Sequence, residues 1–382
     1  MNPVFILGLF DTGYYAARML RNLGIPIIGF DYSRENPGFY SKYIIPFLIP
    51  NPDSQPGELL QILLEKRKRF KEKPLLLPAS EPYLEFIRTK WQELYEEFLF
   101  CVPSPDVLSA ILKKSDQIGM AEKAGIDVPK YHIVEGRADL YGITRRLSFP
   151  IIVKGINPVK WKAKVPQKAL VANDIEEIEE ISARLLSNDI SFVAQEIVPG
   201  EINNNYEYNA LMLNGKLIQA HVIQKKQQYP LYVGSACCIQ TVKNIQVEEL
   251  GFRFITTNRL EGFSNTEFKL DSKNGTYYFI ETNARIWQQI ELTSRCGGNL
   301  IRTYYNHMTH QGKYEAATKN PNAKIWVDLP PYLLLLIRYK KMSGLSYIEA
   351  LRTLVRAKQY GLISIHDPRP FLHSVGVIQS GR

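Results

Sequence analysis

Two carboxylates, an amide and a guanidinium are spaced along the sequence in a pattern that predicts a site for a metal ion and phosphate. The segment "FIETNARIW" (279–287) sets Glu281, Asn283 and Arg285 at every second position, and Glu267 lies upstream in "NTEFKLD". Side chains two apart on a strand project from the same face. Two carboxylates and an amide form an oxygen ligand set that suits Mg²⁺ or Mn²⁺. Mg²⁺ commonly fills its remaining positions with phosphate oxygens.

A hairpin brings these residues together. If residues 273–275 form a three-residue loop with glycine in the left-handed position, Glu267 falls opposite Glu281. Like charges directly opposite each other destabilise a sheet. One reading is an exposed face on which Lys269 and Arg285 relieve the repulsion. The flanking strand is rich in Phe and Ile, which favours the other reading, a central hairpin whose acids hold a metal ion.

A phosphate site also requires cations elsewhere in the chain. Lys154 ends the apolar run "FPIIVK", and Lys113 and Lys114 open the helical unit before it. The stretch that follows Lys154, residues 157–168, is rich in lysine. Its side chains either neutralise phosphates as a flap or form a solvated loop. Together with the acidic hairpin, these lysines predict a phosphate site more strongly than any single lysine does.

Composition limits the classes of protein that fit. The chain has 382 residues, 45% hydrophobic and 22% charged, with a formal net charge of +9, which is typical of a globular protein with a polyanionic partner. No apolar run reaches the roughly eighteen residues that a membrane-spanning helix needs, and we expect no transmembrane segment. Four cysteines without CxxC spacing predict buried thiols in a reducing cytoplasm. We find no nucleic-acid-binding motif and expect no nucleic acid partner.

The N-terminus reads as a strand, glycine turn, helix and strand, a βαβ unit that predicts a parallel sheet. Gly8 and Gly13 flank the turn, but Phe10 stands where a dinucleotide fingerprint requires glycine. Asp31 ends the second strand, as a ribose-binding acid would. We interpret the unit as a Rossmann-like domain without a dinucleotide.

The remaining elements follow from periodicity and turn signals. We expect strands at 74–80, 100–108, 149–156 and 191–200, helices at 81–98 and 174–189, and a helix pair ended by Gly125. Hairpins are predicted around Asn214-Gly215 and Asn274-Gly275, and helical segments at 291–308 and beyond about residue 330.

In this order of elements the chain resembles the ATP-grasp superfamily over roughly residues 1–310. The resemblance rests on the Rossmann-like start, a lysine before a "GIxxP" turn, the strand-end lysine, "QEIVPG" and the "E…E-x-N-x-R" hairpin. More narrowly, "LLLPASEPYLEFI", "KKQQYP", "ETNARIW" and "DPRPF" are similar to the predicted carboxylate–amine ligase branch, which includes D-aspartate ligases.

The resemblance implies roles for individual residues. Lys114 and Lys154 would bind the nucleotide phosphates, and Arg285 would hold the transferred phosphoryl group together with Lys154. Glu267, Glu281 and Asn283 would bind Mg²⁺. The hinge that contacts the adenine and the ribose would consist of Gln195, Glu196, Ile197, Val198 and Glu201, with Asn203 as an alternative to Glu201.

The resemblance also implies an α/β fold: a Rossmann-like domain (1–105), then a two-lobed ATP-grasp domain with antiparallel sheets. Its small lobe would span 106–190, its large lobe 191–320, and a C-terminal helical extension 321–382. The expected activity is ATP-dependent ligation of a small carboxylate to an amine through an acyl phosphate, in a cytoplasmic enzyme that often forms dimers. The alternative is a nucleotide-binding regulatory protein without turnover.

The substrate side departs from the family pattern. Gln288 and Gln289 follow Trp287, where many relatives have a small residue. The candidates for binding the substrate carboxylate are Arg295, Lys225 and Lys226. The identity of the two substrates stays open.

Overall fold

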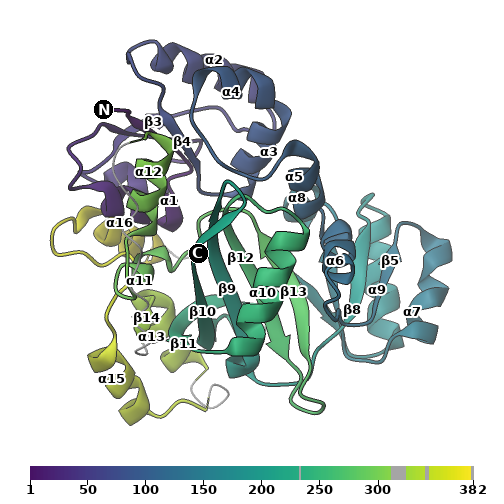
Figure 1. The fold of residues 1–382 in the computed structure, drawn as a ribbon. Coiled ribbons are helices and arrows are strands. Elements are labelled where there is room, and N and C mark those ends of the chain that lie inside the picture. The colour runs from purple at the N-terminus through teal and green to yellow at the C-terminus, as the bar shows by residue number, and fades with distance from the viewer. Residues whose placement is uncertain (232–233, 311–323, 340–343, 380–382) are drawn as a thin grey trace.

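Three β-sheets organise the chain in the computed structural model, which describes residues 1–231, 234–310, 324–339 and 344–379. One four-stranded sheet is N-terminal, a second forms the small lobe, and a six-stranded sheet lies between them (Figure 1). The expected α/β class with a parallel sheet followed by antiparallel sheets is confirmed.

The N-terminal sheet is parallel, in the order β3-β2-β1-β4, so the predicted βαβ unit is confirmed. Asp31 ends β2, and its carboxylate accepts hydrogen bonds from the main-chain N–H groups of Leu9 (2.6 Å) and Ser33 (3.0 Å). This acid therefore fixes the turn after β1. The elements of the domain are β1 Val4–Leu7, α1 Asp11–Leu20, β2 Ile27–Asp31, η1 Pro37–Tyr40, β3 Ile45–Leu48, α2 Pro56–Arg67, β4 Leu75–Pro78, α3 Glu81–Thr89 and α4 Trp91–Glu97.

The small lobe is an antiparallel sheet, β5-β8-β6-β7, with a hydrophobic core of its own. Two helices lead into it, and the second, α6, ends at Gly125 in the left-handed conformation (φ +63°) with the two hydrogen bonds of a Schellman motif. The elements are α5 Pro105–Ile111, α6 Lys114–Lys123, β5 Tyr131–Val134, η2 Arg137–Asp139, α7 Leu140–Arg146, β6 Ile151–Gly155, α8 Pro158–Lys164, β7 Leu170–Ala172, α9 Ile175–Leu186 and β8 Phe192–Glu196.

The large lobe is the antiparallel sheet β13-β12-β9-β10-β11-β14. Both predicted hairpins form, and Asn214 and Gly215 take the positive φ values (53° and 72°) of a two-residue turn. The elements are η3 Ile202–Asn204, β9 Asn205–Leu213, β10 Lys216–Tyr229, β11 Ser235–Val242, α10 Ile245–Thr257, β12 Gly262–Leu270, β13 Tyr277–Asn283, α11 Ile290–Thr293, α12 Leu300–Met308, β14 Ile325–Val327, α13 Leu329–Arg338, α15 Tyr347–Arg356 and α16 Arg369–Gln379.

Several sequence-based expectations about elements were wrong. The helix expected at 81–98 is two helices, α3 and α4, separated at Lys90, and this break lets the second helix bury Leu94. Prolines at 103 and 105 prevent a strand at 100–108, and the preceding residue, Leu99, makes an isolated bridge to Leu75 of β4. The strand β3 was missed because it contains Pro46, which an edge strand tolerates.

The C-terminal part of the chain was expected to be helical, yet it also adds a strand, β14, at the edge of the large sheet. The segment 291–308 holds two helices, α11 and α12, joined by turns. Within the described ranges, no helix has both the length and the apolarity to cross a membrane.

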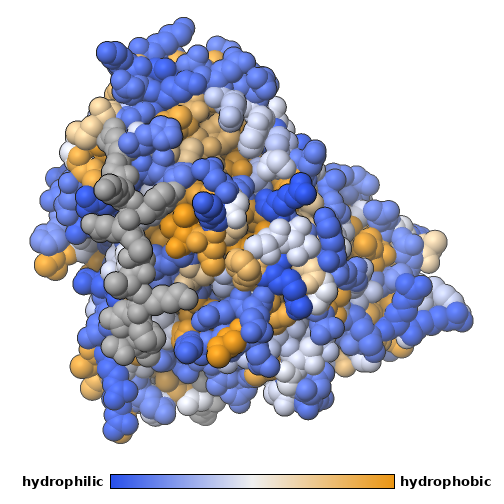
Figure 2. All heavy atoms as spheres, viewed as in Figure 1, coloured by the Kyte–Doolittle hydropathy of each residue, from blue (hydrophilic) through white to orange (hydrophobic). Residues whose placement is uncertain are grey.

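Packing ties the N-terminal domain to the large lobe. One hydrophobic cluster runs from Phe5 and Leu76 in the N-terminal sheet to Phe254 and Phe279 in the large lobe, and the small-lobe core is separate. On the face in Figure 2, hydrophobic residues gather between the N-terminal domain and the large sheet. The sheet of the small lobe therefore has a core of its own, whereas α5 and α6 pack with the N-terminal domain and the large lobe.

Candidate active site

Three acids form one row across the large sheet. Glu281 on β13 pairs with Glu267 on β12, as predicted, and Glu267 pairs in turn with Glu207 on β9. Paired residues on antiparallel strands project from the same face. The carboxylates therefore converge on one face of the sheet.

The pairing of Glu267 with Glu281 is confirmed, but the hairpin reaches it by another route. The main-chain N–H of Asp271 donates to the carbonyl oxygen of Thr276 at the end of the strand pairing. The loop therefore has four residues, 272–275, in place of the predicted three. A register shift between Glu267 and Phe268 then adds one residue to β13. The two differences cancel at the acids.

A second row, of asparagines, lies next to the acids. Asn283, Asn265 and Asn209 pair across the same three strands. Asn283 donates its amide N–H to Asn265 Oδ1 (3.4 Å), and Asn265 donates to Glu207 (2.7 Å) and to Asn209 (2.7 Å). Because the nitrogen of Asn283 is used in this way, its carbonyl oxygen is the atom that can face a metal ion.

Two lysines neutralise the acidic row. Lys225 on β10 lies 2.6 Å from Glu267 and 3.5 Å from Glu207, and Lys114 on α6 lies 2.9 Å from Glu281. Burial lowers the pKa of Lys225, but the two carboxylates outweigh it and the pKa is raised overall. Lys114 above all, with Lys154 and Lys225, favours the ionised form of Glu281, so the pKa of Glu281 is well below the ordinary range although burial opposes this. Burial and the charge of Glu267 raise the pKa of Glu207 to about 7.

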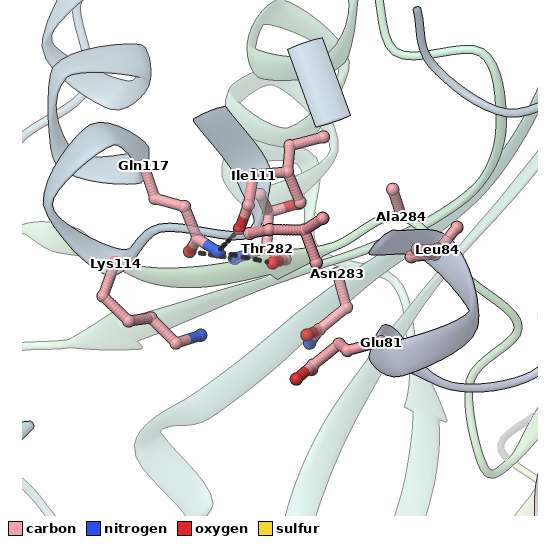
Figure 3. A pocket seen from close by; sticks show the side chains of 9 residues that line it. Glu81, Leu84, Ile111, Lys114, Gln117, Thr282, Asn283 and Ala284 are labelled. Atoms are coloured by element: carbon pink, nitrogen blue, oxygen red, sulfur yellow. Dashed lines mark hydrogen bonds between the residues drawn. The ribbon is translucent and has the colours of Figure 1, made fainter. Parts of the chain in front are cut away.

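Helix α6 is fixed to the hairpin directly beside these charges. The side-chain amide of Gln117 exchanges two hydrogen bonds of 3.0 Å with the main chain of Thr282, between Glu281 and Asn283. Lys114 lies one turn earlier on the same helix face. Figure 3 shows Lys114, Glu81 and Asn283 around this point, where the cavity of about 10 Å³ has room for one water molecule. The anchor at Gln117 thus positions Lys114 at the acid.

The small lobe contributes Lys154 from β6. It donates to Gln195 Oε1 (3.3 Å) on β8, and no ion pair forms with it in the described part of the chain. Burial lowers the pKa of Lys154, and repulsion from Lys114 and Lys225 adds to the effect, whereas Glu281 and Glu267 oppose it. A buried cation under such repulsion is stabilised by any additional anion.

Among the described lysines of the flap, Lys168, in the loop after α8, reaches the large lobe. Its ammonium donates to Ser235 at the start of β11 (2.7 Å) and lies within electrostatic reach of Glu267 and Glu281. Lys160 instead pairs with Asp189 (2.8 Å) on the surface. Lys164 is exposed, and the side chain of Lys162 lies outside the described residues.

The charges and donor atoms together fit a metal–polyphosphate group. Five cations lie around four carboxylates: Lys114, Lys154, Lys168, Lys225 and Arg285 against Glu81, Glu207, Glu267 and Glu281. The charge that remains in excess is positive and favours an anion. The oxygen atoms of Glu267, Glu281 and Asn283 form a ligand set of the type that Mg²⁺ prefers.

The hinge residues divide between two faces of the small-lobe sheet. Gln195 pairs with Ile152 and projects with Lys154 toward the acids. Glu196, the next residue, alternates to the other face, where its carboxylate accepts from the N–H of Ser148 (2.8 Å). The side chain of Glu196 is thus directed away from the cleft, and only its main chain can face an adenine ring there.

The other predicted hinge residues lie at the end of β8. Ile197 is exposed and Val198 is buried. Glu201 is exposed at the start of η3, where its N–H donates to Asn204 Oδ1 (3.1 Å), and Asn203 offers its carbonyl oxygen to Gln224.

The candidates for substrate recognition are separated by the fold. Arg285 lies 3.7 Å from Glu81, at the start of α3. Lys225 is in the cleft, but Lys226 lines a cavity beside α13 and α15. Arg295 is exposed after α11. Lys226 therefore lies away from the cleft, whereas Arg295 stays a prediction as a ligand of the substrate carboxylate.

Sequence reasoning missed Glu207. The signal was present, because "EYN" (207–209) repeats the Glu-x-Asn spacing of 281–283 in a strand that is otherwise buried. Lys168 had no such signal, since its position depends on how the loop after α8 folds.

Comparison with known proteins places this geometry in a family. Residues 214–306 match the model of the ATP-binding domain of the carbamoyl-phosphate synthase L chain. The chain is 22% identical to D-aspartate ligase of Enterococcus faecium (strain Aus0004) over 317 residues, which covers 78% of this chain and 75% of that protein.

Solved structures agree at the level of the fold. The N5-carboxyaminoimidazole synthetase of Staphylococcus aureus complexed with ADP superposes with a TM-score of 0.66 at 14% identity (89% of this chain, 86% of that one). The L-amino acid ligase of Bacillus licheniformis gives 0.66 at 15% (85% and 79%). The biotin carboxylase domain of a Hydrogenobacter thermophilus enzyme, in complex with MgADP, gives 0.66 at 14% (85% and 74%). In sequence and in fold, the chain is thus similar to the ATP-grasp superfamily.

Proposed function

We propose that the protein is an ATP-dependent carboxylate–amine ligase that forms ADP, phosphate and an amide. The observation that carries the proposal is the row of acids on the large sheet, with Lys154 and Lys168 of the small lobe within electrostatic reach of it. Lysines of both lobes thus surround a ligand set for Mg²⁺. The similarity to D-aspartate ligase and to L-amino acid ligase supports the ligase class.

Each lobe has its part in binding the nucleotide. Lys114, Lys154, Lys168 and Lys225 contact phosphate oxygens, and the main chain of 196–198 contacts the adenine. Gln195 presents its amide on the same face as Lys154, and Glu201 contacts the ribose. Glu267, Glu281 and Asn283 hold Mg²⁺, which when bound neutralises phosphate charge and favours attack at phosphorus.

The reaction has two steps. An oxygen of the substrate carboxylate attacks the γ-phosphorus, the bond to the β–γ bridging oxygen breaks, and ADP leaves with its electron pair. The amine nitrogen then attacks the carbonyl carbon of the acyl phosphate, phosphate leaves, and the amine releases one proton to water. Lys154 and Arg285 stabilise the transferred phosphoryl group, and no protein nucleophile is required.

The substrates approach from the side of the N-terminal domain. Arg285 faces Glu81 there, and Gln288 donates to Asp11 (3.3 Å) at the start of α1. Gln289 is buried. These contacts make the segment after β13 the region that shapes the acceptor pocket, and small carboxylates and amines are its expected ligands.

Phosphate release, screened with pools of carboxylates and amines, tests the proposal, and mass spectrometry identifies the amide. We expect release that requires one member of each pool and Mg²⁺. Nucleotide binding without release in any pool would favour the alternative, a regulatory protein that binds nucleotide.

Assembly is a separate expectation. The H. thermophilus domain is described as a dimer, and we propose a homodimer here as well. Light scattering after gel filtration measures the mass directly.

A further inference from the structure

A second cavity lies on the opposite side of the large sheet from the acidic row. It is an open cavity with a volume of about 440 Å³, and it lies between β10, β11 and β14 on one side and α13 and α15 on the other. This volume is within the range of roughly 300–1,000 Å³ that small-molecule sites occupy. Nothing in the proposed ligase reaction uses this cavity.

The strand β10 separates the two sites. Lys225 points to Glu267 in the cleft, and Lys226, the next residue, lines the second cavity. A register shift in the pairing of β10 with β11 between Lys225 and Gln227 interrupts the alternation of side chains, so Lys226 and Gln227 both line the cavity while Lys225 faces the cleft. A ligand in the cavity therefore contacts neither the acids nor the nucleotide-binding lysines.

The walls carry an excess of positive charge. Lys226 from β10 and Arg352 and Arg356 from α15 line the cavity, and Glu349 is its one acid among the described lining residues. The carboxylate of Glu349 already accepts from the N–H (3.0 Å) and the hydroxyl (2.8 Å) of Ser346, as the cap of α15. Two arginines four positions apart lie on the same side of a helix, and arginine forks match carboxylate and phosphate oxygens.

The inner wall provides neutral polar atoms and apolar contact. Gln227 Oε1 and the Tyr332 hydroxyl are buried, and neither has a hydrogen-bond partner of normal geometry in the described residues, although Thr353 lies near the tyrosine. Buried polar atoms without partners are costly and are usually satisfied by a ligand or water. Ile325 and Leu345 add apolar surface.

From these features we propose that the cavity is a binding site for a small organic oxyanion, a carboxylate or a phosphate ester, that also carries a hydrogen-bond donor. Lys226, Arg352 and Arg356 hold the anionic group, and Gln227 Oε1 accepts from the donor. The apolar wall accommodates an organic body, so inorganic phosphate alone is a poorer ligand.

Calorimetric titration of the full chain with glutamate, 3-phenylpropionate, glycerol phosphate and inorganic phosphate tests the site. We expect at least one organic anion to bind in the millimolar range or tighter. The double variant Arg352→Gln/Arg356→Gln and the single variant Lys226→Gln, on a different element, should each weaken it by about tenfold or more. Arg369→Gln, an exposed arginine on α16, is the matched control and should bind as the wild type does.

ADP affinity serves as the folding control, because the cavity variants leave the cleft intact and should not change it. The titrations need no turnover, so their outcome is independent of the ligase proposal. Absence of binding for all the organic anions, or binding that both cavity variants retain, would overturn the site.

Discussion

Replacement of Glu281 by glutamine tests the acidic row most directly. The variant keeps the shape of the side chain and removes its charge. Lys114 then loses its partner at 2.9 Å, and Glu267 becomes the remaining charged metal ligand of the proposed set. Stability and Mg²⁺-dependent nucleotide binding should both change, for separable reasons.

The effect on stability is modest. The side chains of Lys114 and Glu281 are 24% and 29% exposed, so their pair is intermediate between a surface pair and a buried one. We expect a loss of about 1–2 kcal/mol at neutral pH. The depressed pKa of Glu281 means that the wild-type advantage is present above its ordinary value of 4.5 and is lost as the pH falls further. Urea unfolding at several pH values measures this difference.

The effect on nucleotide binding is larger than the effect on stability, and its direction depends on whether Mg²⁺ is present. Removal of a carboxylate adds to the excess of positive charge, so ATP without metal should bind as well as before or more tightly. Mg²⁺ should tighten ATP binding in the wild type, and this tightening should fall by about tenfold to hundredfold in the variant, since even outer-shell partners of a metal have effects of this size. Titrations of ATP with Mg²⁺ and with EDTA give the two dissociation constants.

Glu249→Gln, on the exposed side of α10, is the control for loss of one negative charge. If Mg²⁺ tightens ATP binding by the same factor in Glu281→Gln as in the wild type, the assignment of the metal to this row is wrong.

Three further predictions concern other parts of the site and the fold. Lys154→Gln should lower ADP affinity by about tenfold or more. The melting temperature should stay unchanged or rise, because burial lowers the pKa of Lys154 and its charge destabilises the protein when no ligand is bound. A clear drop in melting temperature would contradict this. Burial raises the pKa of Asp328 to about 7 and of Asp11 to about 6. Asp328→Asn should therefore stabilise the protein at pH 8 by about 1–2 kcal/mol, and thermal unfolding should show this gain shrink as the pH falls from 7 and vanish below the ordinary aspartate pKa of 3.8. Trp161→Ala should destabilise the small lobe by about 3–5 kcal/mol, because this side chain is buried and packs on Gly155; a native-like denaturant midpoint would refute the packing argument.

Local pattern was sufficient for much of the fold. The βαβ start, both Asn-Gly hairpins and the pairing of Glu267 with Glu281 follow from alternation and turn chemistry. The elements that were missed depend on tertiary context. Pro46 is tolerated only because β3 is an edge strand, and β14 forms only because β11 presents a free edge.

The hairpin also shows why a correct pairing does not prove a correct local structure. The predicted loop was one residue too short, and the register shift in β13 compensated for it. Sequence cannot locate such a shift, because a bulge costs little in the strand itself and is selected by what the strand must pair with on both sides.

The same limit applies to side chains next to each other in sequence. Lys113 is exposed while Lys114 binds Glu281, Gln195 faces the cleft while Glu196 does not, and Lys225 and Lys226 serve different cavities. Alternation divides each pair but does not say which member faces the acids. That depends on which side of the sheet the helices cover.

The acids themselves supply the missing constraint on β10. A shift of this strand by one residue would exchange Lys225 and Lys226 between faces. Glu207, which is buried, and Glu267 would then lack their cation, and an uncompensated buried charge costs about 3–5 kcal/mol. The register of β10 is therefore fixed by the charges of the proposed site as well as by its hydrophobic pattern. The residues that we propose to bind metal and phosphate thus also select the strand pairing that brings them together.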